Sequence, residues 1–258
     1  GGRRIARRHR LWFHVDASYG GPLCLSARYR GLLAGLGEAD SVALDPHKWL
    51  YAPLDVGCVL LRDPAAARDA FPVAGEYAAV LAPGDRESHI FFGSSPELSR
   101  RFRALKVWII LKYHGTRRLA GRIEQDVALT RRLGDLIERC PETELLAPIA
   151  TSVACFRYLP RGGRRPGTAL DRLNRDLLVD LQAEGRVYLS NARIKGRFAL
   201  RACLINFRTR DLDLRALLKE VVRVGRRLCA SPARAEGRRT PRRRRGTAPR
   251  NPPGNTVS

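Results

Sequence analysis

Short apolar runs that lead into an aspartate mark the first fifty residues of the chain. Residues 11–16 form an aromatic and β-branched run ending at Asp16, and residues 41–44 form a second apolar run followed by Asp45. Both runs predict buried strands. The stretch 26–37 between them contains three leucines and predicts one helix that ends at a glycine. A strand–helix–strand unit makes its strands parallel, so both aspartates are expected at one sheet edge, where open α/β sheets bind ligands.

The pattern changes twice before residue 140. Residues 56–61 predict a third strand, and residues 71–96 lose periodicity, which is typical of a long functional loop. From 98 to 139 the apolar positions follow a helical period. Gly115 and Gly121 are expected to divide this run into two helices.

Strands and helices then alternate in the last third of the chain. Residues 152–158, 187–190 and 199–205 predict strands, because they are short apolar runs bounded by loop residues. Residues 170–184 and 212–228 predict amphipathic helices, because their leucines and valines recur at helical spacing. This mixture is typical of a small α+β domain.

Together the elements predict an α/β fold with two domains and a tail. Residues 1–140 would form a large domain with a helical connector, and residues 141–230 would form the small α+β domain. Residues 231–258 hold many Pro and Arg residues without periodicity, which predicts a disordered basic tail.

Composition narrows the class of protein. With 258 residues, of which 44% are hydrophobic, the chain is expected to fold. It contains no apolar run long enough to cross a membrane and no signal peptide at its start, so we expect a cytoplasmic protein. The six cysteines form no C-x-x-C pair, so they are expected to be reduced core residues, with no metal site.

The net charge of +23 indicates an anionic partner only weakly, because much of it lies at the ends of the chain. Residues 231–258 hold eight arginines and one glutamate, and residues 1–10 hold five more arginines. The other basic residues are spread over predicted helices, and those at 100–103 are expected on a solvated or interface face. Nucleic-acid binding therefore stays an alternative main role, and non-specific binding through the tail is expected.

One lysine and one aspartate carry the candidate chemistry. Lys48 follows the second predicted strand and Asp16 ends the first. A lysine amine condenses with the aldehyde of pyridoxal phosphate (PLP), and a carboxylate facing the ring nitrogen keeps that nitrogen protonated. His47 could contact the cofactor phosphate or aid proton transfer. The alternative is an aspartate in a turn or helix cap beside a solvated lysine.

Several motifs in register resemble the group II PLP-dependent amino-acid decarboxylases, a family that includes the aromatic-amino-acid and glutamate decarboxylases. The resemblance runs from about residue 5 to residue 228. It is carried by HVDASYGG (14–21), ADS (39–41), DPHKWL (45–50), SRRFRALKVW (99–108), VYLSN (187–191), GRFALRAC (196–203) and NFRT (206–209).

The resemblance implies a fold, a reaction and roles for particular residues. The fold would be the aspartate aminotransferase-like fold type I, and the reaction would turn an L-amino acid into its amine and CO2, which makes the protein a carboxy-lyase of amino-acid metabolism. Lys48 would carry PLP and Asp16 would face its ring nitrogen, while His14, Ser18 and His47 would contact the cofactor. The family forms homodimers with active sites at the subunit interface.

Two departures from the family leave the activity open. In the family a long segment precedes these motifs and supplies a ring-stacking residue, usually His, so this sequence is expected to be the carboxyl-terminal half of a decarboxylase. A catalytically inactive, truncated PLP-fold protein is therefore one alternative. The family's loop tyrosine, which protonates the intermediate, would fall near Ile90 or Phe91, where no Tyr occurs. An aldehyde-forming relative is the other alternative.

Three further residues are candidates for the substrate side of the site. His89 or Tyr77 could replace the missing proton donor, and His89 is also a candidate substrate contact; the alternative for His89 is a solvated loop residue. Arg201 lies inside a predicted strand among apolar residues, where an unpaired charge is costly. In glutamate-type relatives the arginine of this motif approaches the substrate carboxylate. The alternative is a structural ion pair with an internal Asp or Glu.

Overall fold

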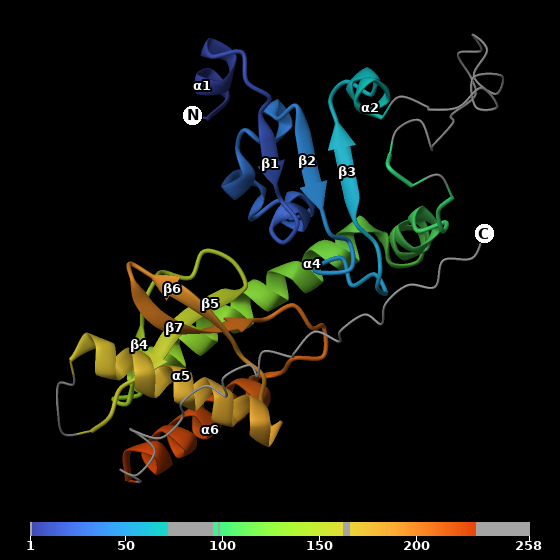
Figure 1. Cartoon of the computed structure of the whole chain (residues 1–258). Helices are drawn as coiled ribbons and strands as arrows, with labels where there is room; N and C mark the ends of the chain where they lie inside the picture. Colours follow the sequence, from blue (N-terminus) through green and yellow to red (C-terminus); the bar gives the residue numbers. More distant parts are fainter. Residues whose placement is uncertain (1, 72–94, 98, 162–165, 231–258) are drawn as a thin grey trace, which may run out of the picture.

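The computed structural model describes residues 2–71, 95–97, 99–161 and 166–230, which form two separate sheets linked by one long helix (Figure 1). The first sheet has the strand order β1-β2-β3, and the second has the order β4-β5-β7-β6. Helix α4 runs from beside the first sheet to the second (Figure 1). The two sheets confirm the predicted mixture of α/β and α+β parts, while the domain division at residue 140 stays a prediction.

The first sheet contains the predicted parallel strand pair. Strand β1 (His14–Asp16) pairs in parallel with β2 (Ser41–Leu44), and Asp16 lies opposite Ala43. Strand β3 (Cys58–Leu61) pairs antiparallel with β2. The prediction that β1 is buried was wrong, because His14 and Asp16 are exposed on this edge strand. Only alternate residues such as Val15 turn toward the small apolar cluster beneath it.

The connection between β1 and β2 contains no α-helix, so the prediction of one helix over 26–37 was wrong. The chain instead makes three short 3₁₀ helices: η1 (Gly21–Leu25), η2 (Arg30–Leu33) and η3 (Leu36–Glu38). Gly35 separates the last two with a φ of 92°, a left-handed conformation that glycine adopts without steric cost. Two short α-helices, α1 (Gly2–Arg8) and α2 (Ala65–Ala70), flank the sheet along the chain.

Helix α4 (Ala104–Arg139) joins the two halves of the molecule. Its helical geometry breaks at Gly115, where φ is 72° and ψ is 155°, which confirms one of the two predicted breaks. The helix passes through Gly121 without interruption, so the second predicted break was wrong. Beyond the kink, Ile123 and Val127 pack against the first half of the chain, and the next turns of α4 pack against the second sheet.

The second sheet is antiparallel throughout. Its strands are β4 (Thr143–Leu145), β5 (Val153–Tyr158), β6 (Ser190–Ile194) and β7 (Arg197–Cys203). Helices α5 (Gly167–Glu184) and α6 (Asp211–Ala230) pack with the end of α4 on one face of this sheet. These elements confirm four of the predicted ones: β5, β7, α5 and α6.

Two strands of this sheet differ from the prediction. The strand expected at 187–190 begins only at Ser190 and continues to Ile194, because the tight turn at Lys195 and Gly196 sets the register with β7. Both turn residues have positive φ, as a two-residue hairpin turn requires. Strand β4 was missed, since three residues are too few to show a period.

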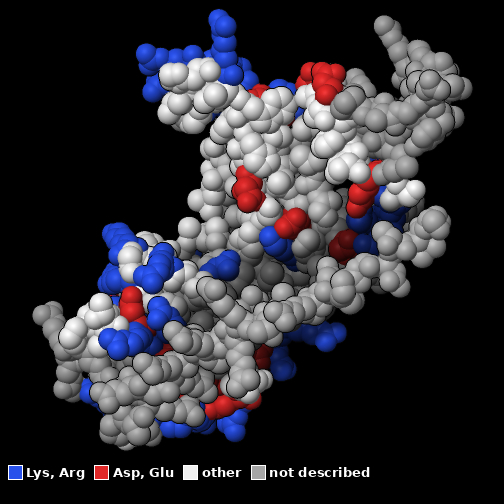
Figure 2. Space-filling model, viewed as in Figure 1, with Lys and Arg blue, Asp and Glu red and all other residues white. Residues whose placement is uncertain are grey.

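Surface features complete the fold. All six cysteines are free. Their expected place in the core was wrong for Cys24, Cys58 and Cys203, which are exposed, whereas Cys229 is partly buried against the core. Basic side chains gather around α1 and over the second sheet, with acidic side chains among them (Figure 2). Within the ranges given above, none of the helices is long and apolar enough to span a membrane. The tail, 231–258, lies outside the described residues.

Candidate functional site

The carboxyl ends of β1 and β2 bring the two central candidate residues together. Asp16 is the last residue of β1, and Lys48 lies in the turn that follows β2. The Asp45 N–H donates to the Ser18 carbonyl over 3.3 Å, which fastens the start of that turn to the chain beyond β1. The charge of Lys48 is close enough to act on the Asp16 carboxyl. The expected convergence at one sheet edge is therefore present.

Lys48 is paired and still accessible. Its Nζ lies 2.7 Å from Oδ2 of Asp45, and 38% of its side chain is exposed. The turn itself is ordered by the Lys48 N–H, which donates to the Asp45 carbonyl over 2.9 Å. The Lys48 amine is therefore fixed by an ion pair and still accessible to solvent, unlike a freely solvated surface lysine.

Asp16 is held in its ionised form. Its Oδ1 accepts hydrogen bonds from the hydroxyl and from the backbone N–H of Ser18, the latter over 3.0 Å. These bonds lower the pKa of the Asp16 carboxyl, and the charges of Lys48 and His14 lower it further. The backbone contact is the turn role of the alternative interpretation. Among the described residues no hydrogen bond reaches Oδ2, so this oxygen can accept one from a ligand.

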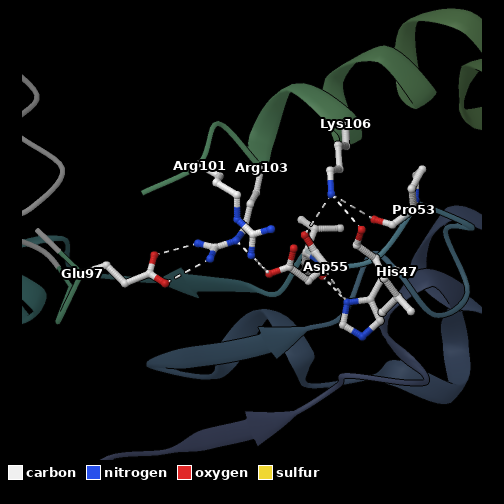
Figure 3. Close-up of polar contacts among 9 residues, drawn as sticks. His47, Pro53, Asp55, Glu97, Arg101, Arg103 and Lys106 are labelled. Atoms are coloured by element: carbon white, nitrogen blue, oxygen red, sulfur yellow. Dashed lines mark hydrogen bonds and ion pairs between the residues drawn. The ribbon is translucent and has the colours of Figure 1, made fainter. Parts of the chain in front are cut away.

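The two candidate histidines are oriented by specific contacts. The Trp12 indole N–H donates to Oγ of Ser41 over 2.7 Å, and the same oxygen lies 2.7 Å from Nδ1 of His14. The Ser41 hydroxyl therefore contacts both side chains and orients the His14 ring. Nδ1 of His47 lies 2.6 Å from the Val56 carbonyl oxygen and 3.3 Å from the Val56 backbone nitrogen, so the backbone of Val56 orients this ring (Figure 3).

Basic residues at the start of α4 bind the segment that follows the lysine turn. Lys106 Nζ donates to the Leu54 carbonyl over 3.0 Å, while Arg101 and Arg103 donate to Oδ2 of Asp55 over 2.8 and 3.2 Å (Figure 3). Arg103 also pairs with Glu97. The expected solvated face is confirmed for Arg101, whose side chain is 72% exposed while it pairs with Asp55. It was wrong for Arg103, whose side chain is 25% exposed between Asp55 and Glu97.

Sequence reasoning missed a buried carboxylate beneath the lysine turn. Oδ2 of Asp126, on α4, accepts from Nε1 of Trp49 over 2.9 Å and from the Tyr51 hydroxyl over 2.7 Å. Burial raises the pKa of the Asp126 carboxyl, and the two hydrogen bonds oppose that rise. The available signal was an acidic residue on the apolar face of a helix, between Ile123 and Val127.

Arg201 stands on the side of β7 that faces away from the helices. Its neighbours Leu200 and Ala202 are buried in the core, while Arg201 is half-buried on the opposite face. No carboxylate of the described residues forms an ion pair with it, so the alternative of an internal ion pair fails there. Its guanidinium lies 4.0 Å from Sγ of Cys203, and its charge lowers the pKa of the Tyr19 hydroxyl, against the larger rise that burial causes.

The remaining candidates cannot be placed. His89, Tyr77, Ile90 and Phe91 all lie outside the described residues. The roles proposed for His89 and Tyr77 as proton donors therefore stay predictions from the sequence. No cluster of three His, Cys, Asp or Glu side chains suited to a metal ion occurs in the part of the chain that the structure describes.

The chain has the fold of fold type I PLP enzymes: a sheet with parallel strands, whose carboxyl ends carry a lysine and an aspartate, is linked by a long helix to an antiparallel α+β part. Solved structures of PLP decarboxylases share it. The chain belongs to the pyridoxal-dependent decarboxylase family: the profile of the "Pyridoxal-dependent decarboxylase conserved domain" matches residues 3–159.

Individual relatives agree with this assignment. An aromatic-L-amino-acid decarboxylase of Bacillus atrophaeus is 34% identical over 212 residues, which cover 82% of this chain and 44% of the relative. The structure of Oryza sativa TDC with PLP and tryptamine has a TM-score of 0.78 and 27% identity, over 88% of this chain and 46% of that one. The 4-hydroxyphenylacetaldehyde synthase of Rhodiola rosea has a TM-score of 0.74 and 26% identity, over 87% and 45%. The chain thus spans less than half the length of these relatives.

Proposed function

We propose that this chain binds PLP at Lys48 and serves the decarboxylation of an L-amino acid to its amine and CO2. The observation that carries the proposal is the convergence of an accessible lysine amine and an ionised aspartate at one sheet edge. Family membership and the PLP-bound structure of a relative support it.

The residues present fit the cofactor. Bound PLP would supply an aldehyde for the lysine and a ring that accepts the electrons of the breaking bond. Oδ2 of Asp16 is free to accept the N–H of a protonated ring nitrogen, and the Ser18 bonds keep that carboxyl ionised. His47 precedes the lysine in the same turn, His14 is the first residue of β1, and Ser18 follows its end.

The lysine needs release as well as placement. A protonated amine is not a nucleophile, so Lys48 has to give up a proton before it acts. Its 2.7 Å contact with Asp45 stabilises the charged amine and holds it in place until a ligand competes. We infer that Asp45 keeps the amine at the sheet edge, where Asp16 fixes the far side of the same site.

The substrate class we propose is an aromatic L-amino acid. Relatives named for tryptophan and tyrosine decarboxylation support this choice. Arg201 faces the Tyr19 side of the site without an ion-pair partner in the described residues, so it is our candidate for the substrate carboxylate. The same family resemblance supports a cytoplasmic homodimer.

Aldehyde formation is a second candidate. The sequence has no Tyr near Ile90 and Phe91, and one of the structural relatives is an aldehyde synthase. In that case the amino acid would react with O2 and one water molecule. O2 would accept two electrons and become hydrogen peroxide, water would supply the aldehyde oxygen, and CO2 and ammonia would leave.

Product analysis tests these proposals. The purified chain is incubated with PLP and carboxyl-labelled L-tryptophan, L-tyrosine or L-glutamate, and released CO2 is measured together with the organic product by mass. We expect CO2 and the amine from an aromatic substrate, complete loss in Lys48→Ala, and no loss in Lys219→Ala, an exposed lysine of α6. An aldehyde with ammonia would support the second candidate. No turnover of any substrate would contradict activity of this chain.

A further inference from the structure

The lysine turn rests on one buried carboxylate of the long helix. Asp126 is 2% exposed, and its Oδ2 receives the Trp49 indole N–H at 2.9 Å and the Tyr51 hydroxyl at 2.7 Å. These donors are the first and third residues after Lys48. The Asp126 carboxylate therefore connects Trp49 and Tyr51, on the carboxyl-terminal side of Lys48, to α4.

The same contact reaches the aspartate side of the site. Trp49 is fully buried, and Tyr19 stacks on it with ring centroids 5.2 Å apart and an interplanar angle of 19°. Tyr19 lies three residues after Asp16. A fixed Trp49 ring thus sets the position of Lys48 directly and that of the chain after Asp16 by packing.

Asp126 is itself well fixed. It lies between Ile123 and Val127, both fully buried in the cluster that contains Trp49. The Thr130 hydroxyl donates to the Asp126 carbonyl over 2.7 Å. Burying a carboxylate is costly unless hydrogen bonds compensate, and an apolar side chain would fill the same space at lower cost. What the carboxylate adds is a defined orientation of two donors.

We propose that Asp126 is a positioning residue for Lys48: it holds the turn 45–52 in the conformation that presents the amine beside Asp16. The proposal rests on the proposed role of Lys48 in cofactor binding. Asp126 itself touches neither the amine nor the cofactor position and acts through Trp49 and Tyr51.

Hydrogen exchange measures this role without any cofactor. The amides of Lys48, Tyr51 and Ala52 donate hydrogen bonds within the turn, so their exchange reports its opening. Losing both side-chain bonds in Asp126→Leu is expected to speed exchange of the peptide covering 45–52 by about tenfold or more. Asp126→Asn keeps an acceptor oxygen and is expected to restore most of the protection.

A second buried carboxylate provides the matched control. Glu142 is 1% exposed and pairs with Arg226 of α6, and its carbonyl accepts a hydrogen bond from the Leu159 N–H after β5. These contacts belong to the second half of the molecule. Glu142→Gln should leave exchange of 45–52 unchanged. Trp49→Phe and Tyr51→Phe each remove one donor and keep a ring, so each is expected to give an intermediate increase even if Asp126→Leu does not fold.

Cofactor trapping is the second readout. With PLP and borohydride, the fraction of label on Lys48 relative to the other lysines should fall several-fold in Asp126→Leu and recover in Asp126→Asn. Unchanged exchange in the two Phe variants, or an equal change in Glu142→Gln, would overturn the positioning role. Absence of Lys48 label in the unaltered chain would refute the proposed function instead, and the exchange result would still decide whether Asp126 holds the turn.

Discussion

Ser18 illustrates how a single neighbour sets the charge of a candidate catalytic group. Its hydroxyl and its backbone N–H both donate to Oδ1 of Asp16, and these bonds are the main reason why the pKa of this carboxyl lies below its ordinary value. A carboxylate that must stay ionised beside a protonated ring nitrogen benefits from such donors. The serine also leaves Oδ2 of Asp16 open toward the site.

Removing the Ser18 hydroxyl should raise the pKa of Asp16. In Ser18→Ala the backbone donor remains and the side-chain donor, the larger cause of the shift, is lost. We expect the pKa to move up toward the ordinary value of 3.8, as measured by NMR titration of the Asp16 carboxyl carbon.

The sign of the pH effect follows from the direction of this shift. A lowered pKa means that the Ser18 bonds add stability above the ordinary pKa of the carboxyl and lose it as pH falls through the lowered value. The control variant Ser190→Ala removes a serine hydroxyl on β6 that bonds the Arg201 carbonyl, and it should leave the Asp16 titration unchanged. An unchanged titration in Ser18→Ala would show that the lysine and histidine charges, not the serine, control Asp16.

At this scale the sequence predicted part of the site. Lys48 and Asp16 could be placed together because parallel strands end at the same edge of a sheet, and β1 and β2 pair in parallel although no α-helix connects them. Asp126 could not be found in this way, since its partner Trp49 lies 77 positions away in the sequence. The exposure of Arg201 was also misjudged, because apolar neighbours along a strand point to the opposite face.

Helix α4 is the element on which both halves of the molecule depend. Its start binds the segment after the lysine turn through Arg103 and Lys106, its middle holds Asp126, and its end packs against the second sheet. The kink at Gly115 separates the first of these parts from the others. The direction of this kink therefore decides whether Lys106 and Asp126 can both contact the segment 49–55.

Two glycines of α4 should respond in opposite ways to a methyl group. Gly115 has a φ of 72° and a ψ of 155°, a region that residues with a Cβ avoid, so Gly115→Ala should destabilise the fold by about 1–3 kcal/mol. Gly121 is helical with open space around it, so Gly121→Ala should stabilise by up to about 1 kcal/mol.

Chemical denaturation of the two variants measures both effects. An added Cβ at Gly115 would also meet no atom within 4 Å, so a steric clash is removed as an explanation and only the backbone conformation differs. Equal free energies of unfolding for the two alanine variants would mean that the kink is not a fixed feature of α4.

Element prediction succeeded where periods are long and failed where glycines or short lengths intervene. Helices α5 and α6 were predicted because their apolar residues repeat over several turns. The helix expected at 26–37 was wrong because Gly31, Gly35 and Gly37 favour turns over a continuous helix. Strand β4 contains three residues, and its place depends on β5 rather than on its own sequence.

The whole molecule distributes its positive charge through structural pairs. Arginines of α6 pair with carboxylates of neighbouring elements, as Arg226 does with Glu142 and Arg227 does with Asp180. These pairs give several arginines of α6 a structural role, while the excess of basic over acidic residues keeps the chain strongly positive.

Exposed apolar side chains occur on the first half of α4 and at Phe102, just before it. Phe102, Trp108, Ile109 and Tyr113 are 74%, 58%, 49% and 79% exposed. Exposed apolar side chains of this size are found on surfaces that other polypeptide covers. They agree with a chain that spans less than half the length of its relatives and with the proposed homodimer.

The central claim is that this chain holds PLP on Lys48. Its most direct test adds PLP to the purified chain, reduces with borohydride, digests, and locates the modified peptide by mass. We predict label on Lys48 well above that on the other four lysines, loss of the label in Lys48→Ala, and a weaker label in Asp16→Asn. Label scattered equally over all five lysines, or absent, would contradict the claim that this chain forms a PLP site.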